Sequence, residues 1–157
     1  MSTPPLPPEA TEMLARANPC TVTTLRSDGA PVSTATWYLW EDGRVLLNMD
    51  DGRVRLKHLR RDPRVTLTVL DEDNWYNHIS LLGRVAELRA DTDLSVIDRM
   101  SRLYTGNAYP DRVRTRTTAV VEIDRWHGWG AFKDSDQASA VAERESRPER
   151  RYSPTDT

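Results

Sequence analysis

The basic residues between positions 53 and 64 are the part of the sequence whose types and spacing point most directly to chemistry. The run RVRLKHLRRDPR contains six cations and only one acid, Asp62. Arg53 and Arg55 fall between an expected strand end and an expected helix start, where free backbone N–H groups and the positive helix terminus favour a phosphate. Lys57, one turn beyond Arg53, is expected to share its face. The alternative is a solvated helix face paired with acids elsewhere, and spacing alone leaves both interpretations open.

Other residue types offer little for covalent or metal chemistry. The single cysteine, Cys20, cannot form an intramolecular disulfide, and one cysteine with three histidines gives no zinc-binding spacing. Ser33, Thr34 and Thr36 have no general base nearby in the sequence, which leaves a hydrolase without support. We therefore predict no metal site and name no catalytic residue.

Composition limits the class of protein. A chain of 157 residues fits one domain, and its net charge of −2 argues against the broad positive field of a nucleic-acid-binding protein. Apolar runs are far shorter than the roughly 20 residues of a membrane-spanning helix, and the first residues lack the pattern of a signal peptide. We expect a cytoplasmic protein with a small-molecule substrate, bound neither to nucleic acid nor to a membrane.

The elements that must position the basic residues are mostly strands. Alternating β-branched and apolar residues predict six of them, over residues 20–26, 32–40, 44–49, 64–70, 76–88 and 118–123. Asp–Gly turns join the first three, and Gly83 is expected to bend the fifth. Helices are expected over 9–17, 53–61 and 93–104, the last with Asp91 as its N-cap. This pattern predicts a mainly β (α+β) protein, a six-stranded antiparallel barrel with peripheral helices. Residues 133–157 are too polar to pack and are expected to be a disordered tail.

The order of these segments resembles a known family. The strand, turn, strand and basic helix ending in LRRDPRV, followed by YNHISLLGRVAEL, VIDRMSRLYTG, AYP and RWHGWG, is similar to the F420-dependent branch (flavin/deazaflavin oxidoreductase, B type) of the pyridoxamine 5'-phosphate oxidase-like proteins. The resemblance extends over about residues 8–132. It implies a split β-barrel of the FMN-binding type over residues 1–132, a homodimer, and two cofactors in grooves between the subunits.

The resemblance also implies roles for particular residues. Arg53 and Arg55 match the family's phosphate-binding positions after the third strand, with Lys57 as a third partner. The positions expected to contact the cofactor ring are Ser33, Thr34, Thr36, Trp37 and Tyr38 on the second strand, and Asn48 and Met49 on the third. Tyr38 has an alternative interpretation as a packing or interface aromatic. Trp75, Tyr76 and Tyr109 are expected to line the substrate pocket from either subunit, or to serve only as loop and core aromatics.

The function implied is an oxidoreductase in which reduced coenzyme F420 transfers hydride to a conjugated small-molecule acceptor. The first alternative is an FMN-dependent oxidase or reductase of the same fold, because both cofactors carry a phosphate. The second alternative is a non-catalytic protein that binds F420, flavin, haem or another tetrapyrrole.

Overall fold

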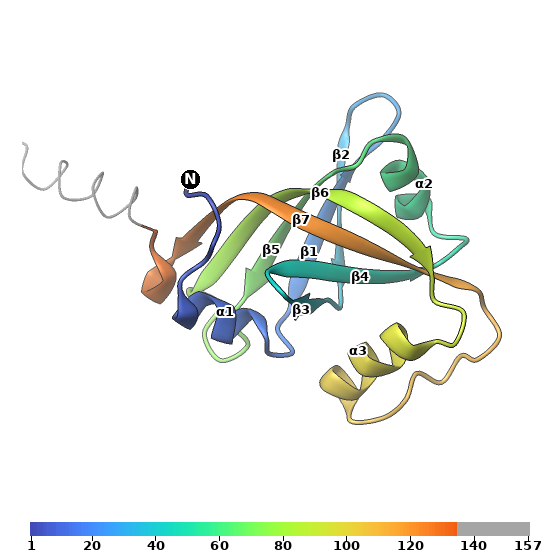
Figure 1. Cartoon of the computed structure of the whole chain (residues 1–157). Helices are drawn as coiled ribbons and strands as arrows, with labels where there is room; N and C mark the ends of the chain where they lie inside the picture. Colours follow the sequence, from blue (N-terminus) through green and yellow to red (C-terminus); the bar gives the residue numbers. More distant parts are fainter. Residues whose placement is uncertain (135–157) are drawn as a thin grey trace, which may run out of the picture.

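A single antiparallel sheet of seven strands dominates the fold (Figure 1). The computed structural model describes residues 1–134. The strands follow one another in the order β2-β1-β5-β6-β7-β4-β3. Their bounds are β1 Cys20–Leu25, β2 Pro31–Thr36, β3 Leu39–Glu41, β4 Arg44–Asp50, β5 Arg64–Leu70, β6 His78–Ala90 and β7 Arg116–Trp129. The helices are α1 Pro8–Leu14, α2 Val54–Arg61 and α3 Ser95–Thr105, followed by the 3-10 turn η1 Gly130–Phe132.

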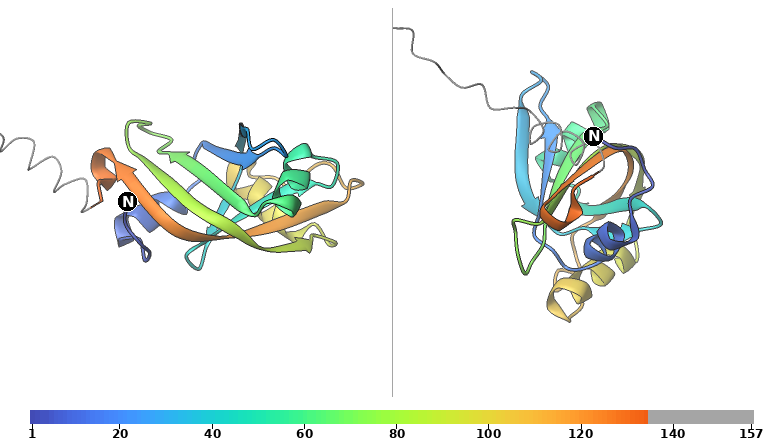
Figure 2. Two further views of the ribbon diagram at one scale, coloured as in Figure 1. Left: turned by 90° about the horizontal axis from the view of Figure 1, so that it is seen from above. Right: turned by 90° about the vertical axis from the view of Figure 1, so that its left-hand side faces the viewer.

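The sheet curls around one hydrophobic core, as the end-on view in Figure 2 shows. Side chains alternate between the two faces of a strand, so Val45, Leu47 and Met49 of β4 point into this core. Val22 of β1 and Leu67 of β5, from the other half of the sheet, pack into the same cluster. Strands far apart in the sheet order therefore enclose a shared interior, which is the geometry of a split barrel.

A glycine allows the longest strands to bend around this core. The β6–β7 register shifts between Leu82 and Gly83 and again between Val85 and Glu87. A Cβ atom on Gly83 would lie 2.0 Å from the carbonyl oxygen of Glu122, so a side chain there would collide with the neighbouring backbone. The predicted bend at Gly83 is confirmed.

The helices close the barrel and cover its outside. α1 and α2 contribute Leu14 and Leu56 to the interior cluster. α3 lies on the outer face of the sheet, where Ile97 and Met100 pack in a second cluster with Leu46 of β4. In Figure 1, α3 sits below β4 and β3, apart from the other helices.

The predicted fold class is confirmed, although the strand count is seven rather than six. The run predicted as one strand over 32–40 is divided because β2 pairs with β1 at one edge of the sheet, whereas β3 pairs with β4 at the opposite edge. Tyr38 lies at this crossing with its side chain fully buried. The chain thus passes from one sheet edge to the other within a few residues.

The two ends of the described chain meet at the same side of the barrel. Ser2 pairs with Trp126 through two backbone hydrogen bonds, and its hydroxyl donates to the buried carboxylate of Asp134. The tail predicted over 133–157 therefore begins with two placed residues, and the remainder lies outside the described residues. Among the described residues, no helix has the length and apolar character that crossing a membrane requires.

Candidate functional site

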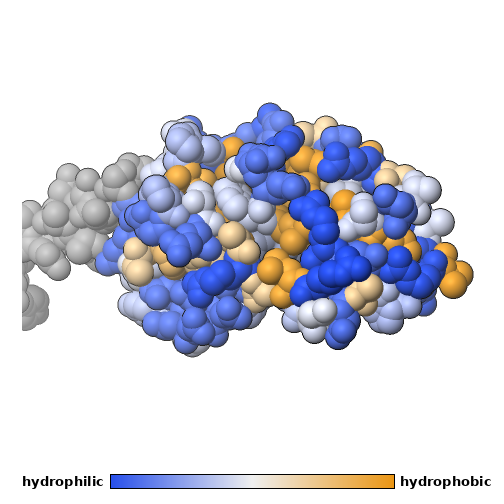
Figure 3. All heavy atoms as spheres, turned by 60° about the horizontal axis from the view of Figure 1, so that its bottom comes forward, coloured by the Kyte–Doolittle hydropathy of each residue, from blue (hydrophilic) through white to orange (hydrophobic). Residues whose placement is uncertain are grey.

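A cleft of about 680 Å³ opens between the β1–β2 edge of the sheet, the outer face of β4 and α3. Figure 3 views the molecule from the side on which α3 lies and shows apolar surface between hydrophilic regions. Ala35 and Thr36 of β2 line one side, and Asn48 and Met49 of β4 line another. A smaller cavity of about 430 Å³ continues along β2 and shares Ala35 with the cleft.

Three arginines form the cationic part of the cleft. Arg53 and Arg55, at the start of α2, line both cavities, and Arg116 at the start of β7 lines the larger one. The Nε of Arg53 donates to Asp50 at 3.0 Å, so this cation already has a carboxylate partner. Arg55 differs, because its Nη1 is buried and has no hydrogen-bond partner among the described residues. Burial, together with the charges of Arg53 and Arg116, lowers the pKa of Arg55.

Asp50 compensates part of this positive charge, but Nη1 of Arg55 stays unpaired, and the start of α2 adds further positive character. No side chain caps the helix, whose N-cap is Arg53 itself in an extended conformation. An anion placed beside Arg55 would satisfy the unpaired donor and relieve the repulsion between the guanidinium groups. A phosphate or carboxylate is the group that this site can bind.

Arg116 is held in place by a buried polar network on the outer face of β4. Its Nε donates to Oδ1 of Asn48 at 2.6 Å, and Nδ2 of Asn48 donates to Asp91 at 2.9 Å. Asp91 in turn accepts hydrogen bonds from the backbone N–H groups of Val96 and Ile97 in the first turn of α3. Asp91 therefore stabilises the helix start as predicted, although Leu94 occupies the formal N-cap position.

Aromatic rings form the wall opposite the strands. Trp37 stacks on Tyr104 with ring centroids 5.2 Å apart and meets Tyr109 edge to face at 6.4 Å. The guanidinium of Arg116 lies 4.7 Å from the centroid of the Tyr109 ring. Burial raises the pKa of Tyr104, whose hydroxyl donates to the carbonyl oxygen of Asn18, so this ring stays neutral. The wall suits a flat, largely apolar ligand.

The structure brings most of the predicted site residues to these cavities. Those that line the cleft are Thr36, Trp37, Asn48, Met49, Arg53, Arg55 and Tyr109. Thr34 lines the adjoining cavity instead. Whether any of them contacts a cofactor stays a prediction.

Three predicted cofactor contacts lie elsewhere. Tyr38 is in the core, and its hydroxyl donates to the carbonyl oxygen of Leu14 at 2.7 Å, which matches its alternative interpretation as a packing residue. Ser33 is exposed on β2 and shares a hydrogen bond with Thr23 across the strand pair. Lys57 is exposed on α2 and lines neither cavity. Whether it shares a face with Arg53 stays a prediction.

The two aromatic residues of the β5–β6 loop are also outside the cleft. Trp75 and Tyr76 are exposed and stack edge to face on each other, and Tyr76 continues this contact to Trp129. Neither residue lines the cavity of its own chain. Their predicted place in a substrate pocket therefore depends on a second subunit.

Several cleft residues were not predicted as site residues. Ile97, Met100 and Tyr104 lie in the segment predicted only as a helix over 93–104, and they form a wall of the cleft. Arg116 had no signal of its own, because it preceded the predicted last strand. Only the β4–β7 register, which pairs Asp50 with Arg116, brings it beside Arg53 and Arg55.

The chemistry available to the described side chains is binding rather than covalent attack. Cys20 lines the cleft, but burial raises the pKa of its thiol to about 12 and keeps it protonated. The hydroxyl of Thr36 donates to the carbonyl oxygen of Trp37. Among residues 1–134, no three His, Cys, Asp or Glu side chains lie together as a metal site would require. The cleft combines a cationic end with an apolar, aromatic wall.

Comparisons with known proteins agree with the fold. The family described as pyridoxamine 5'-phosphate oxidase matches residues 6–130. A solved structure of an F420 reductase is 22% identical with a TM-score of 0.71, covering 77% of this chain and 98% of that one. A conserved hypothetical protein from Mycobacterium tuberculosis is 23% identical with a TM-score of 0.62, over 81% of this chain and 86% of its own. HupZ from Group A Streptococcus is 13% identical with a TM-score of 0.58, over 83% and 99%. Curated protein sequences give no significant match.

Proposed function

The chain belongs to the pyridoxamine 5'-phosphate oxidase family, and from this premise we propose that it is an oxidoreductase that uses reduced coenzyme F420. Members of this family typically bind FMN or F420. The choice of F420 draws on the sequence motifs described above and on the fold shared with a solved F420 reductase. The observation that supports a phosphorylated cofactor is the buried, unpaired Nη1 of Arg55 in a cationic cleft.

The cofactor phosphate would bind at the start of α2. Arg55 would donate to it with the Nη1 atom that has no protein partner, and Arg53 would add a second charge. Arg116, fixed by its hydrogen bond to Asn48, would complete the cationic site from the β7 side. Hydrogen bonds from charged donors to a phosphate are the strong class of such bonds, so this end of the cleft would provide most of the binding energy.

The ring would lie along the apolar part of the cleft. Trp37 and Met49 would contact its faces and edges, and Met100 would shield it from water. When bound, the reduced deazaflavin supplies the hydride. The protein would align the ring with a conjugated small-molecule acceptor and exclude water, and no side chain would become covalently attached.

We further propose that a second copy of the chain completes the site. β2 is an edge strand whose residues 31–35 are all exposed, and the cleft opens along it. An open edge of this kind needs a cover. The partner's loop carrying the exposed Trp75 and Tyr76 would then be available to line the substrate side of the cleft. Sedimentation with cofactor present tests this, since a monomer of 17.9 kDa at micromolar concentration would contradict it.

Fluorescence titration followed by turnover tests the main proposal. Purified protein is titrated with F420 and with FMN, and the reduced cofactor that binds is then mixed with quinones, enones and biliverdin-like acceptors. Tight F420 binding with acceptor-dependent oxidation supports the proposal. Preference for FMN would favour the FMN-dependent alternative, and tight binding without oxidation would favour a carrier. Binding of neither cofactor would overturn the proposal.

A further inference from the structure

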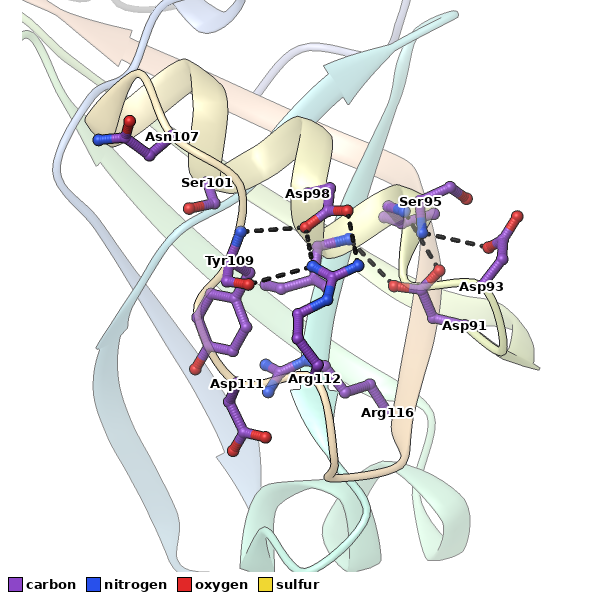
Figure 4. A network of polar contacts seen from close by, with 12 residues as sticks. Asp91, Asp93, Ser95, Asp98, Ser101, Asn107, Tyr109, Asp111, Arg112 and Arg116 are labelled. Carbon is purple, nitrogen blue, oxygen red and sulfur yellow. Dashed lines mark hydrogen bonds and ion pairs between the residues drawn. The ribbon is translucent and has the colours of Figure 1, made fainter.

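The loop of residues 106–115 joins α3 to β7 and contributes Tyr109 to the wall of the cleft. A loop of this length needs anchors if one of its side chains is to keep a fixed position. Its anchor on α3 is Asp98, one turn along the helix and buried. Figure 4 shows Asp98 pointing from α3 toward Tyr109 and Arg112.

Asp98 and Arg112 together form a clamp on the backbone of Tyr109. Its Oδ1 accepts the backbone N–H of Tyr109 at 3.0 Å and Nη1 of Arg112 at 2.6 Å, while its Oδ2 accepts Nη2 of Arg112 at 3.2 Å. Nη1 of Arg112 also donates to the carbonyl oxygen of Tyr109 at 3.1 Å. Both backbone polar groups of Tyr109 are thus held by this one ion pair. The paired geometry is that of a charge-assisted bidentate hydrogen bond.

The Asp98 side of the clamp lies on α3, which is itself held in place. Asp91 caps the first turn of α3, and Ile97 and Met100 hold the helix against the sheet. Arg112, by contrast, is half exposed, so the loop half of the clamp reaches solvent. Because Asp98 is fixed on α3, its hydrogen bonds hold the 106–115 loop in place relative to that helix.

The residue that the clamp holds belongs to the cleft, but the clamp itself does not. Tyr109 meets Trp37 edge to face and carries Arg116 over its ring. Neither Asp98 nor Arg112 is among the residues that line the cleft. A change in the clamp can therefore reach a bound ligand only through the position of Tyr109 and its neighbours.

We infer that Asp98 and Arg112 are positioning residues that fix Tyr109 as the wall of the cofactor cleft and thereby set the affinity and orientation of the bound ring. This inference rests on the proposed function, because it presumes that a cofactor occupies the cleft. It assigns the two residues no contact with the cofactor and no part in hydride transfer. Their effect is expected on binding and on the environment of the ring.

The test uses Arg112→Ala, with Arg112→Lys as the conservative variant and Arg102→Ala as the matched control. Arg102 lies on α3 one turn after Asp98, is exposed, and has no side-chain hydrogen bond or ion pair described. Its loss removes the same charge from the same neighbourhood without opening the clamp. Each protein is titrated with F420 and FMN, and the absorption shift of the bound ring is recorded. A second readout, amide hydrogen exchange of Tyr109 without cofactor, reports the clamp itself.

Arg112→Ala should weaken binding of whichever cofactor the native protein binds by about twofold to fivefold, the modest effect expected of a half-exposed pair. It should also change the absorption shift and speed amide exchange at Tyr109. Arg112→Lys should recover part of each effect, and Arg102→Ala should match the native protein. In a Tyr109→Ala background, Arg112→Ala should cause no further loss, because its effect passes through that ring.

The outcomes separate this inference from the proposed function. If the native protein binds neither F420 nor FMN, the proposed function fails, and the exchange of the Tyr109 amide still tests the clamp. If the native protein binds a cofactor and Arg112→Ala binds it with the same affinity and the same spectrum, the inference is overturned. Equal losses in Arg112→Ala and Arg102→Ala would also overturn it, because they would indicate a general charge effect.

Discussion

Replacing Arg55 by methionine should stabilise the ligand-free protein and weaken its binding of the cofactor. The side chain keeps a similar length, but the buried Nη1 and its charge disappear. A buried donor without a partner costs about 1–3 kcal/mol, and the lower end applies because Arg55 is only partly buried. Removing repulsion from Arg53 and Arg116 acts in the same direction. The free energy of unfolding should therefore rise by about 1 kcal/mol, which raises Tm by roughly 2–4 °C in a protein of this size.

Binding should change in the opposite direction. A hydrogen bond to a charged group contributes about 1.5–3 kcal/mol, so losing Arg55 should weaken cofactor binding roughly tenfold to a hundredfold. Thermal unfolding and fluorescence titration on the same samples measure both effects. Arg60→Met is the control, since Arg60 is exposed on the same helix and lines neither cavity. A fall in the Tm of the ligand-free Arg55→Met protein, or equal losses of affinity in the two variants, would show that Arg55 is not an unpaired phosphate-binding group.

Three further predictions concern stability and reactivity. Hydrogen bonds from Arg112 lower the pKa of Asp98, so the ion pair stabilises the protein fully above the unfolded pKa of about 3.9 and is lost as the pH falls through the lowered value. The Tm difference between the native protein and Asp98→Asn should therefore be large at pH 7 and shrink below about pH 4. A Tm difference that does not change with pH would contradict this. Cys20, with its pKa raised to about 12, should react with iodoacetamide at pH 8 far more slowly in the folded than in the unfolded protein, as mass spectrometry can record. Gly83→Ala should lower the free energy of unfolding by roughly 1–3 kcal/mol in urea titration, because its Cβ would meet the carbonyl oxygen of Glu122; an unchanged midpoint would exclude that collision.

Local patterns were enough to predict most elements of the fold. The alternation over Arg64–Leu70 predicted β5 with its observed bounds, and Gly83 predicted the bend in β6. These predictions agree with the structure because each depends on residues that are adjacent in the chain. Arg53 and Arg55 were predictable together for the same reason, because they are two residues apart in the chain. Both line the cleft.

The rest of the site depends on contacts between distant segments. Arg116 enters the cleft only because β7 pairs with β4, and that pairing leaves no trace near Arg116 in the sequence. Tyr38 was assigned to the cofactor ring through the family resemblance, as part of one strand over 32–40, whereas the chain leaves β2 at Thr36 and crosses the barrel. Lys57 was expected beside Arg53 from helical spacing, and it is exposed on α2 and lines neither cavity. Long-range strand pairing therefore decided where the side chains of Arg116 and Tyr38 lie.

The identity of the cofactor that co-purifies with the protein decides between F420 and its alternatives. The protein is produced in a host that makes F420, purified without added cofactor, and denatured, and the released small molecule is examined by absorbance and mass spectrometry. We expect F420, at about one molecule per subunit in the native protein and at much lower occupancy in Arg55→Met. Release of FMN in its place, or of no cofactor from protein that is folded and dimeric, would contradict it.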